Sequence, residues 1–141
     1  MQKITPFLWF DGKAQEAMKF YVSIFKNSKI LNANRFELDG QQFYVLDGGP
    51  QFTFTPAVSF FVNCESQEEV DDLWEKLSEG GEKGRCGWLK DKYGLSWQVI
   101  PSDLGKMLGD KDPEKAKRVR NAMLQMNKID IKGLKQAYDQ G

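Results

Sequence analysis

Residues 85–101 read RCGWLKDKYGLSWQVIP, and this stretch decides the fold because an altered copy of it occurs earlier in the chain. When residue n is set beside residue n+53, residues 6–10 (PFLWF) lie over residues 59–63 (SFFVN). Both segments are short apolar runs rich in aromatic and β-branched residues, a composition typical of strands. The repeat therefore predicts two copies of one structural module.

Each predicted strand is followed by apolar residues at a spacing of three and four, which is typical of one face of a helix. The aligned positions are Ala17, Phe20, Tyr21 and Ile24 in the first copy and Val70, Leu73, Trp74 and Leu77 in the second. We expect Phe20, Tyr21 and Trp74 to belong to the core, because packing is the commoner role of aromatic residues on a helix face.

The ends of these helices also have sequence signals. Ser66 precedes Glu69 in the pattern that satisfies free amides at a helix start, and Gly80-Gly81 supplies a stop. For the first helix, the cap is expected at Asp11 or Gly12, since both residue types serve at that position.

The remaining strands of each module form hairpins. Asp39-Gly40 predicts a tight turn because this pair tolerates the positive backbone angles that such turns need. The expected strands are residues 28–31, 36–40 and 42–46 in the first copy, and 82–84, 88–91 and 95–100 in the second. Each module is then β-α-β-β-β, and the fold class is α+β.

Residues beyond Pro101 lose this pattern. Asp112-Pro113 is a favourable cap and first-turn pair, and helical spacing follows it. Two helices are expected, one with Ala116, Val119, Met123 and Met126, and a shorter one with Ile131, Leu134 and Tyr138. We predict one domain: module one at about 1–49, a connector at about 50–56, module two at about 57–101 and a helical tail at about 102–141.

Composition excludes several classes of partner. The chain has 141 residues and 40% hydrophobic content, enough for a sizeable core. Its 20 basic and 20 acidic residues offer no electrostatic attraction to nucleic acid or to anionic membranes. No apolar run spans a bilayer, and Met1 leads directly toward the first strand, so we expect a cytoplasmic protein with reduced cysteines.

The chain resembles the PhnB-like branch of the vicinal oxygen chelate superfamily, which includes glyoxalase I, extradiol dioxygenases and bleomycin-resistance proteins. The segments that match are TPFLWFDG (5–12), FYVSIF (20–25), GGP (48–50), CGWLKD (86–91), GLSWQ (94–98) and residues 118–126. The resemblance implies that the two modules form a curved, half-open sheet whose concave face holds a ligand. It also implies a homodimer.

The superfamily's metal-dependent members take four ligands from equivalent strand positions. By resemblance, these positions fall near Thr5 or Pro6, Tyr44, Val58 or Ser59, and Gln98. None of these side chains is a strong metal ligand, and the chain contains no histidine. We therefore expect no metal and no other cofactor, although recruitment of an acid such as Glu37 or Asp47 stays open.

Five residues are candidates for the ligand pocket: Trp9, Tyr44, Ser59, Trp88 and Gln98. Aromatic side chains on strands suit an apolar wall, and an amide suits a ligand's polar group. Gln98 has a second interpretation, in which it shares a strand face with Ser96 and only forms a hydrogen bond across the sheet.

The two cysteines and one charged pair offer weaker evidence of function. Cys64 and Cys86 are candidates for a reactive thiol, yet a cysteine nucleophile needs a base or a positive charge, and no histidine is present. Lys90 and Asp91 are interpreted as an exposed ion pair beside a turn.

The sequence therefore favours a small-molecule-binding protein whose ligand is partly apolar or aromatic. The branch is also named after 3-demethylubiquinone 3-methyltransferase, so a methyltransferase acting on a quinone-like phenol is one alternative. Against it, no strand leads into a glycine-rich turn and helix, the usual arrangement for an adenosyl cofactor. A metal-dependent lyase, isomerase or dioxygenase is the other alternative, and whether any reaction is catalysed stays open.

Overall fold

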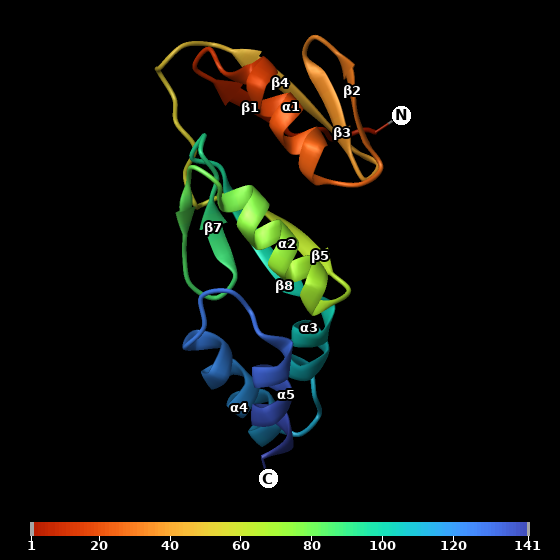
Figure 1. Cartoon of the computed structure of the whole chain (residues 1–141), viewed down its shortest axis with the longest axis vertical. Coiled ribbons are helices and arrows are strands. Elements are labelled where there is room, and N and C mark those ends of the chain that lie inside the picture. The colour runs from red at the N-terminus through yellow and green to blue at the C-terminus, as the bar shows by residue number, and fades with distance from the viewer. Residues whose placement is uncertain (1, 141) are drawn as a thin grey trace. The chain divides into compact units, whose positions relative to one another are not determined.

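The computed structural model describes residues 2–140, which form five α-helices and two four-stranded sheets. The chain divides into two compact units, Met1–Phe54 and Thr55–Gly141 (Figure 1). Each unit has the order β-α-β-β-β, and the second unit continues into three further helices. The predicted α+β class with two tandem modules and C-terminal helices is confirmed.

The first unit is one mixed sheet with one helix. Its strands lie in the order β1-β4-β3-β2, with β1 parallel to β4 and the other neighbours antiparallel. The elements are β1 (Phe7–Phe10), α1 (Ala14–Ile24), β2 (Ser28–Asn32), β3 (Arg35–Leu38) and β4 (Gln41–Asp47). The turn between β3 and β4 has φ of 47° at Asp39 and 85° at Gly40, as expected for a tight Asp-Gly turn.

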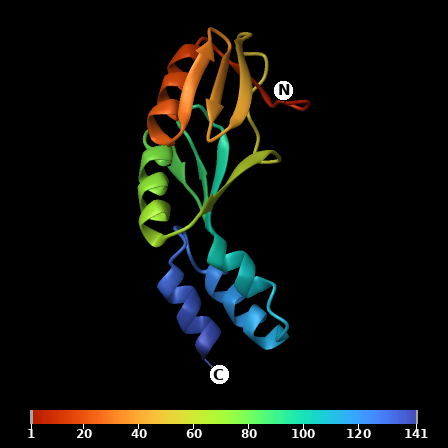
Figure 2. The same cartoon turned by 90° about the vertical axis from the view of Figure 1, so that its right-hand side faces the viewer.

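One face of this sheet is buried and the other is open. Helix α1 covers one side of the sheet (Figure 2). Alternate residues of the strands are buried, because successive side chains of a strand point to opposite faces. The buried strand residues are Leu8, Phe10, Phe36, Leu38, Phe43 and Val45, and the helix contributes Ala14, Ala17, Met18 and Tyr21. We call the opposite side the open face of the first sheet.

The second unit repeats this plan. Its sheet has the order β5-β8-β7-β6, and β5 is parallel to β8. The elements are β5 (Ser59–Cys64), α2 (Gln67–Ser78), β6 (Glu82–Lys83), β7 (Trp88–Lys90) and β8 (Ser96–Pro101). Val70, Leu73, Trp74 and Leu77 of α2 are buried, as the helical spacing predicts.

The strand pairing corrects the alignment of the repeat. Phe7 pairs with Tyr44 in the first sheet, and Phe61 pairs with Gln98 in the second, so strand residues correspond at n+54. The helices correspond at n+53, since three residues link β1 to α1 and only two link β5 to α2. The offset of 53 was therefore wrong for the strands by one residue, which exchanges the two faces of a sheet.

The two helix starts are satisfied differently. Ser66 accepts a hydrogen bond of 3.1 Å from the Glu69 amide, as predicted. The cap of α1 was predicted wrongly, because its first amide, that of Ala14, donates at 2.9 Å to the Asp47 carboxylate at the end of β4. A contact between distant segments replaces the local cap there.

The C-terminal helices form a small core of their own. They are α3 (Ser102–Leu108), α4 (Pro113–Leu124) and α5 (Ile131–Asp139); the sequence predicted α4 and α5 but did not identify α3 as a separate helix. Leu104, Val119, Ile129 and Leu134 are buried together with Ile100 of β8. Every helix within residues 2–140 is too short or too polar to cross a bilayer.

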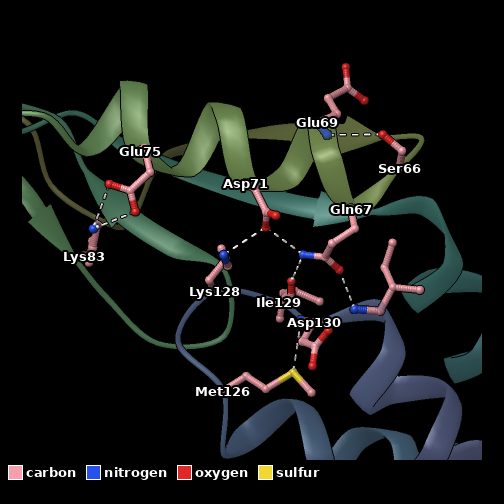
Figure 3. A network of polar contacts seen from close by, with 11 residues as sticks. Ser66, Gln67, Glu69, Asp71, Glu75, Lys83, Met126, Lys128, Ile129 and Asp130 are labelled. Atoms are coloured by element: carbon pink, nitrogen blue, oxygen red, sulfur yellow. Dashed lines mark hydrogen bonds and ion pairs between the residues drawn. The ribbon is translucent and has the colours of Figure 1, made fainter.

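Gln67 connects this helical core to α2 (Figure 3). Its side-chain amide donates at 2.9 Å to the Ile129 carbonyl, and its side-chain oxygen accepts at 2.7 Å from the Ile131 amide. Lys128 forms an ion pair of 2.9 Å with Asp71, whose carboxylate also accepts from Gln67. These two hydrogen bonds lower the pKa of Asp71, that from Gln67 contributing most. The Gln67 side chain thus bonds one backbone group just before α5 and one at its first residue.

Asp91 contradicts the predicted exposed ion pair with Lys90. Its side chain is 2% exposed and accepts hydrogen bonds from the Tyr93 amide, the Leu95 amide and the Trp97 indole. An aspartate that accepts several hydrogen bonds within a turn is a structural element of that turn. The turn between β7 and β8 is therefore built around a buried carboxylate.

Candidate functional site

On the open face of the first sheet, three side chains form a row across three neighbouring strands. Arg35 of β3 pairs with Tyr44 of β4, which pairs with Phe7 of β1. The rings of Phe7 and Tyr44 stack with centroids 5.6 Å apart, and the Arg35 guanidinium carbon lies 5.9 Å from the Tyr44 centroid. Phe7 remains 56% exposed. The row is a cation beside two aromatic rings.

The second sheet has the equivalent row. Trp88 of β7 pairs with Gln98 of β8, which pairs with Phe61 of β5. Gln98 donates a hydrogen bond of 3.0 Å to the hydroxyl of Ser59, so it bonds across the sheet, as one of its two interpretations expected. Its amide oxygen accepts no hydrogen bond from residues 2–140, which leaves an acceptor for a ligand.

Tyr44 and Gln98 thus occupy matching positions in the two sheets. A phenol and a carboxamide are weak ligands for transition metals, and the hydroxyl of Ser59 is already bonded to Gln98. Among residues 2–140, no group of three or more His, Cys, Asp or Glu is placed to hold a metal ion. The residues at these positions therefore do not fit the metal of the superfamily's metal-dependent members.

Trp9 is held on the open face of the first sheet by the segment that follows β4. Its indole donates at 2.8 Å to the Gly49 carbonyl, and Phe52 packs edge-on to its ring at 5.0 Å. A Cβ atom at Gly48 would lie 2.2 Å from the Trp9 ring, so only glycine fits beneath it. The segment Gly48-Gly49-Pro50 therefore holds the Trp9 ring in place.

Trp88 lines a small pocket of about 190 Å³ in the second unit. Ser96, which precedes Gln98 on the same strand face, lines the same pocket. The Ser96 hydroxyl is buried and has no hydrogen-bond partner among residues 2–140. A buried polar group without a partner is costly, so this hydroxyl suits the polar group of an occupant.

A wider hollow of about 1200 Å³ lies elsewhere in the second unit, beside α5. Apart from Ile131, its lining residues are polar or charged, and none of the predicted site residues lines it. It is lined by Glu65, Ser66, Gln67, Asp103, Asp130, Ile131, Lys132, Lys135, Gln136, Asp139 and Gln140. This hollow lacks the aromatic walls that the sequence predicts for the ligand.

The two cysteines lie apart from both rows. Cys64 faces the helix side of β5 and is fully buried; burial, together with Glu69 and Glu65, raises the pKa of its thiol to about 12. Cys86 is half-buried with φ of 58°, and its amide donates at 2.8 Å to the Met126 carbonyl. A protonated thiol is a poor nucleophile, so Cys64 has a structural role.

In the two strand-to-helix turns, side chains of this protein already bond amides that an adenosyl-cofactor site would need free. Such sites use a glycine-rich turn and free amides at a helix start. Here the first amide of α1 is bonded to Asp47, and the start of α2 is bonded to Ser66, while the Glu65 amide donates at 2.7 Å to Glu69. The chain's own side chains fill both turns, so these residues do not fit that cofactor.

Sequence reasoning did not identify Phe7, Arg35, Phe61 and Ser96 as site residues. Alternation along the strands is the signal that places Ser96 and Gln98 together. Arg35 and Phe61 could be identified only from the pairing of neighbouring strands, which sets Arg35 beside Tyr44 and Phe61 beside Gln98. The offset of 53 concealed the match of Phe7 with Phe61.

Comparisons with known proteins place the chain among glyoxalase-fold proteins. The sequence model of the 3-demethylubiquinone-9 3-methyltransferase family matches residues 2–37 and 31–100. The solved structure of a PhnB protein from Bacillus cereus shares 40% identity with a TM-score of 0.68, and the match covers 72% of this chain and 100% of that one. Among curated proteins, none matches the chain.

Two more distant structures share the fold. A protein from Pseudomonas aeruginosa has 18% identity and a TM-score of 0.59, with 72% of this chain and 98% of that chain covered. A glyoxalase/bleomycin resistance protein from Albidiferax ferrireducens T118 has 15% identity and a TM-score of 0.50, with 68% and 95% covered. The family match ends at residue 100, so helices α3, α4 and α5 lie beyond it.

Proposed function

The chain belongs to the 3-demethylubiquinone-9 3-methyltransferase family, the PhnB-like branch of the glyoxalase-fold proteins, and from this premise we propose that it binds a small, partly apolar or aromatic molecule without a bound metal. Each open sheet face is a separate ligand surface, the first with the row that contains Tyr44 and the second with the row that contains Gln98. The proposed biochemical function is therefore the binding of this small molecule.

The pocket beside Trp88 carries this proposal. It combines an aromatic wall with the buried Ser96 hydroxyl, which has no partner among residues 2–140. A few placed polar groups within an apolar wall are the general pattern of small-molecule sites. A ligand with one hydroxyl or carbonyl group would satisfy Ser96 while its apolar part contacts the indole.

Titration with 2-naphthol, a neutral aromatic alcohol, tests the proposal. We expect saturable binding by calorimetry, weakened about tenfold or more in Trp88→Ala, because an aromatic wall is commonly the largest contributor to such contacts. Leu124→Ala removes an exposed apolar side chain from α4 and is the matched control, with affinity unchanged. Equal affinity of Trp88→Ala and Leu124→Ala for 2-naphthol would show that Trp88 does not contact the ligand.

The metal-free part of the proposal rests on the donor set, since Tyr44, Ser59 and Gln98 present a phenol, a hydroxyl and an amide. Elemental analysis of protein purified without chelator measures it directly. Near-stoichiometric zinc, nickel, manganese or iron would overturn the proposal and favour the metal-dependent lyase, isomerase or dioxygenase.

We further propose that the protein is a cytoplasmic homodimer, as the family resemblance implies. Phe7 and Phe61, 56% and 53% exposed, both lie on edge strands of their sheets, where a second chain has apolar surface to cover. Sedimentation velocity over a range of protein concentrations distinguishes the dimer from a monomer.

The family description supplies the second candidate, methylation of a quinone-like phenol. Aromatic open faces suit such a substrate, whereas both strand-to-helix turns are filled by Asp47, Ser66 and Glu69. Calorimetric titration with adenosylmethionine separates the candidates. We expect no heat of binding at millimolar ligand, and a saturable isotherm would favour the methyltransferase.

A further inference from the structure

Arg35 is a half-buried cation that lacks an anionic partner among residues 2–140. Its Nε is out of reach of water and has no hydrogen-bond acceptor among residues 2–140. In the described part of the chain, the guanidinium contacts the Tyr44 ring. A charged donor group without an acceptor costs more free energy than a neutral one, so an occupant that presents an anionic oxygen to the half-buried guanidinium is favoured.

The neighbouring charges do not neutralise Arg35. Glu37 is the acid on the same strand face, two residues farther along β3, and it pairs with Lys29 of β2 in the strand register. The sheet neighbours of Arg35 itself are Tyr44 and Asn32, both uncharged. Within the described residues, Arg35 thus forms no ion pair.

The rest of the row is apolar and accessible. Phe7 stacks on Tyr44 and keeps more than half of its surface exposed, and Trp9 lies two residues farther along β1 on the same face. A planar molecule placed on Phe7 and Tyr44 would reach the Arg35 guanidinium with a substituent at its edge. The geometry complements an aromatic body that carries an anionic group.

We infer that the open face of the first sheet binds an aromatic anion, such as an aryl carboxylate or a phenolate, with Arg35 as the residue that selects its charge. This inference rests on the proposed function and states the ligand class for the open face of the first sheet. The equivalent row of the second sheet has Trp88 in the place of Arg35, so the charge preference belongs to the first sheet.

Paired probes of one shape, 2-naphthoate and 2-naphthamide, test the inference on the full chain by calorimetry. We expect 2-naphthoate to bind about tenfold or more tightly, since a charge-assisted hydrogen bond contributes roughly that factor. Arg35→Gln should reduce the preference to less than about threefold, whereas Arg35→Lys, which keeps the charge, should retain part of it. Lys29→Gln removes a cation from the same face and should leave the preference unchanged.

Backbone amide spectra locate the bound probe. Shifts at Phe7, Arg35 and Tyr44 on addition of 2-naphthoate support the inference. Equal affinity for the two probes, or a preference that survives in Arg35→Gln, overturns it while the proposed function stands. Failure of both naphthalene probes and of 2-naphthol to bind overturns both. A dimer that dissociates more readily in Arg35→Gln, with no change in probe preference, assigns the guanidinium to a subunit interface and also overturns the inference.

Discussion

The Trp97 indole donates a hydrogen bond of 2.9 Å to the Asp91 carboxylate, which joins the strand β8 to the turn that precedes it. The other oxygen of Asp91 accepts from the amides of Tyr93 and Leu95 at 2.9 and 3.0 Å. One buried carboxylate thus serves three donors. It fixes the start of the strand that carries Ser96 and Gln98 to the candidate site.

Replacing Asp91 by alanine should therefore be strongly destabilising. Three donors would lose their acceptor, and we expect the free energy of unfolding to fall by about 3 kcal/mol. Urea unfolding monitored by tryptophan fluorescence measures the change. Asp72→Ala is the control, because Asp72 forms an exposed ion pair with Lys76 and should cost less than about 0.5 kcal/mol. Similar losses in the two variants would contradict the structural role of Asp91.

Gly48→Ala should displace Trp9. The added Cβ would lie 2.2 Å from the indole ring, so the ring must move and its hydrogen bond to Gly49 is lost. We expect a loss of about 2 kcal/mol in unfolding free energy, together with a shift of the Trp9 indole signal in a nitrogen-proton spectrum.

Gly105→Ala is the matched change for this experiment. Gly105 lies in α3 with no atom within 4 Å of an added Cβ, so helix propensity alone acts there. We expect a gain of up to about 1 kcal/mol. A destabilising Gly105→Ala, or a neutral Gly48→Ala, would show that the described packing at these glycines is incorrect.

The two thiols should differ sharply in reactivity. At pH 8 in the folded protein, we expect a thiol reagent to modify one cysteine per chain, Cys86, because Cys64 is fully buried and its pKa is raised to about 12. Cys86→Ala should then show no rapid reaction. Rapid modification of Cys86→Ala would mean that Cys64 is accessible.

The same thiol predicts a pH dependence of stability. Since the pKa of Cys64 is raised on folding, its contribution is fully present below the unfolded value near 9 and is lost as the pH rises from there toward 12. The difference in unfolding free energy between the wild type and Cys64→Ala should therefore shrink between pH 8 and pH 10.5. Denaturant unfolding at several pH values measures this difference, and a constant value across the range would contradict the prediction.

Gln67→Ala should release the start of α5. Gln67 bonds to the Ile129 carbonyl and the Ile131 amide (Figure 3), and these two backbone groups have no other partner within residues 2–140. We expect hydrogen exchange at Ile131 to accelerate about tenfold or more, with a loss of about 1 to 2 kcal/mol. Gln125→Ala, at the end of α4, should change neither quantity, because the Gln125 side chain forms no hydrogen bond with any described residue. Unchanged exchange at Ile131 would contradict the connection.

Much of the fold was predictable because its signals are local. Three features depend only on residues that are close together in the chain. They are the helical spacing of Val70, Leu73, Trp74 and Leu77, the Ser66 cap and the Asp39-Gly40 turn. The cap of α1 was not, since Asp47 lies 33 residues from the amide that it bonds. Asp91 was misread for a similar reason, because the Trp97 donor reaches it only after the hairpin closes.

The candidate site divides in the same way. Alternation along a strand predicts that Ser96 and Gln98 share a face, and the weak donor chemistry of Tyr44 and Gln98 can be read directly from residue types. The neighbours across the sheet depend on register, and a one-residue error in the offset exchanges the faces. Arg35 could therefore not be assigned to the aromatic row beforehand.

By itself, the sequence determined the duplicated module, the fold class and the absence of strong ligands at the positions of the superfamily's metal. Only the tertiary structure decided which side chains meet: Asp91 with Trp97, Gly48 with Trp9, and Arg35 with Tyr44. The physical reason is the separation along the chain of the residues that interact. Periodicity and capping act along the chain, whereas burial and strand pairing join residues that the chain separates.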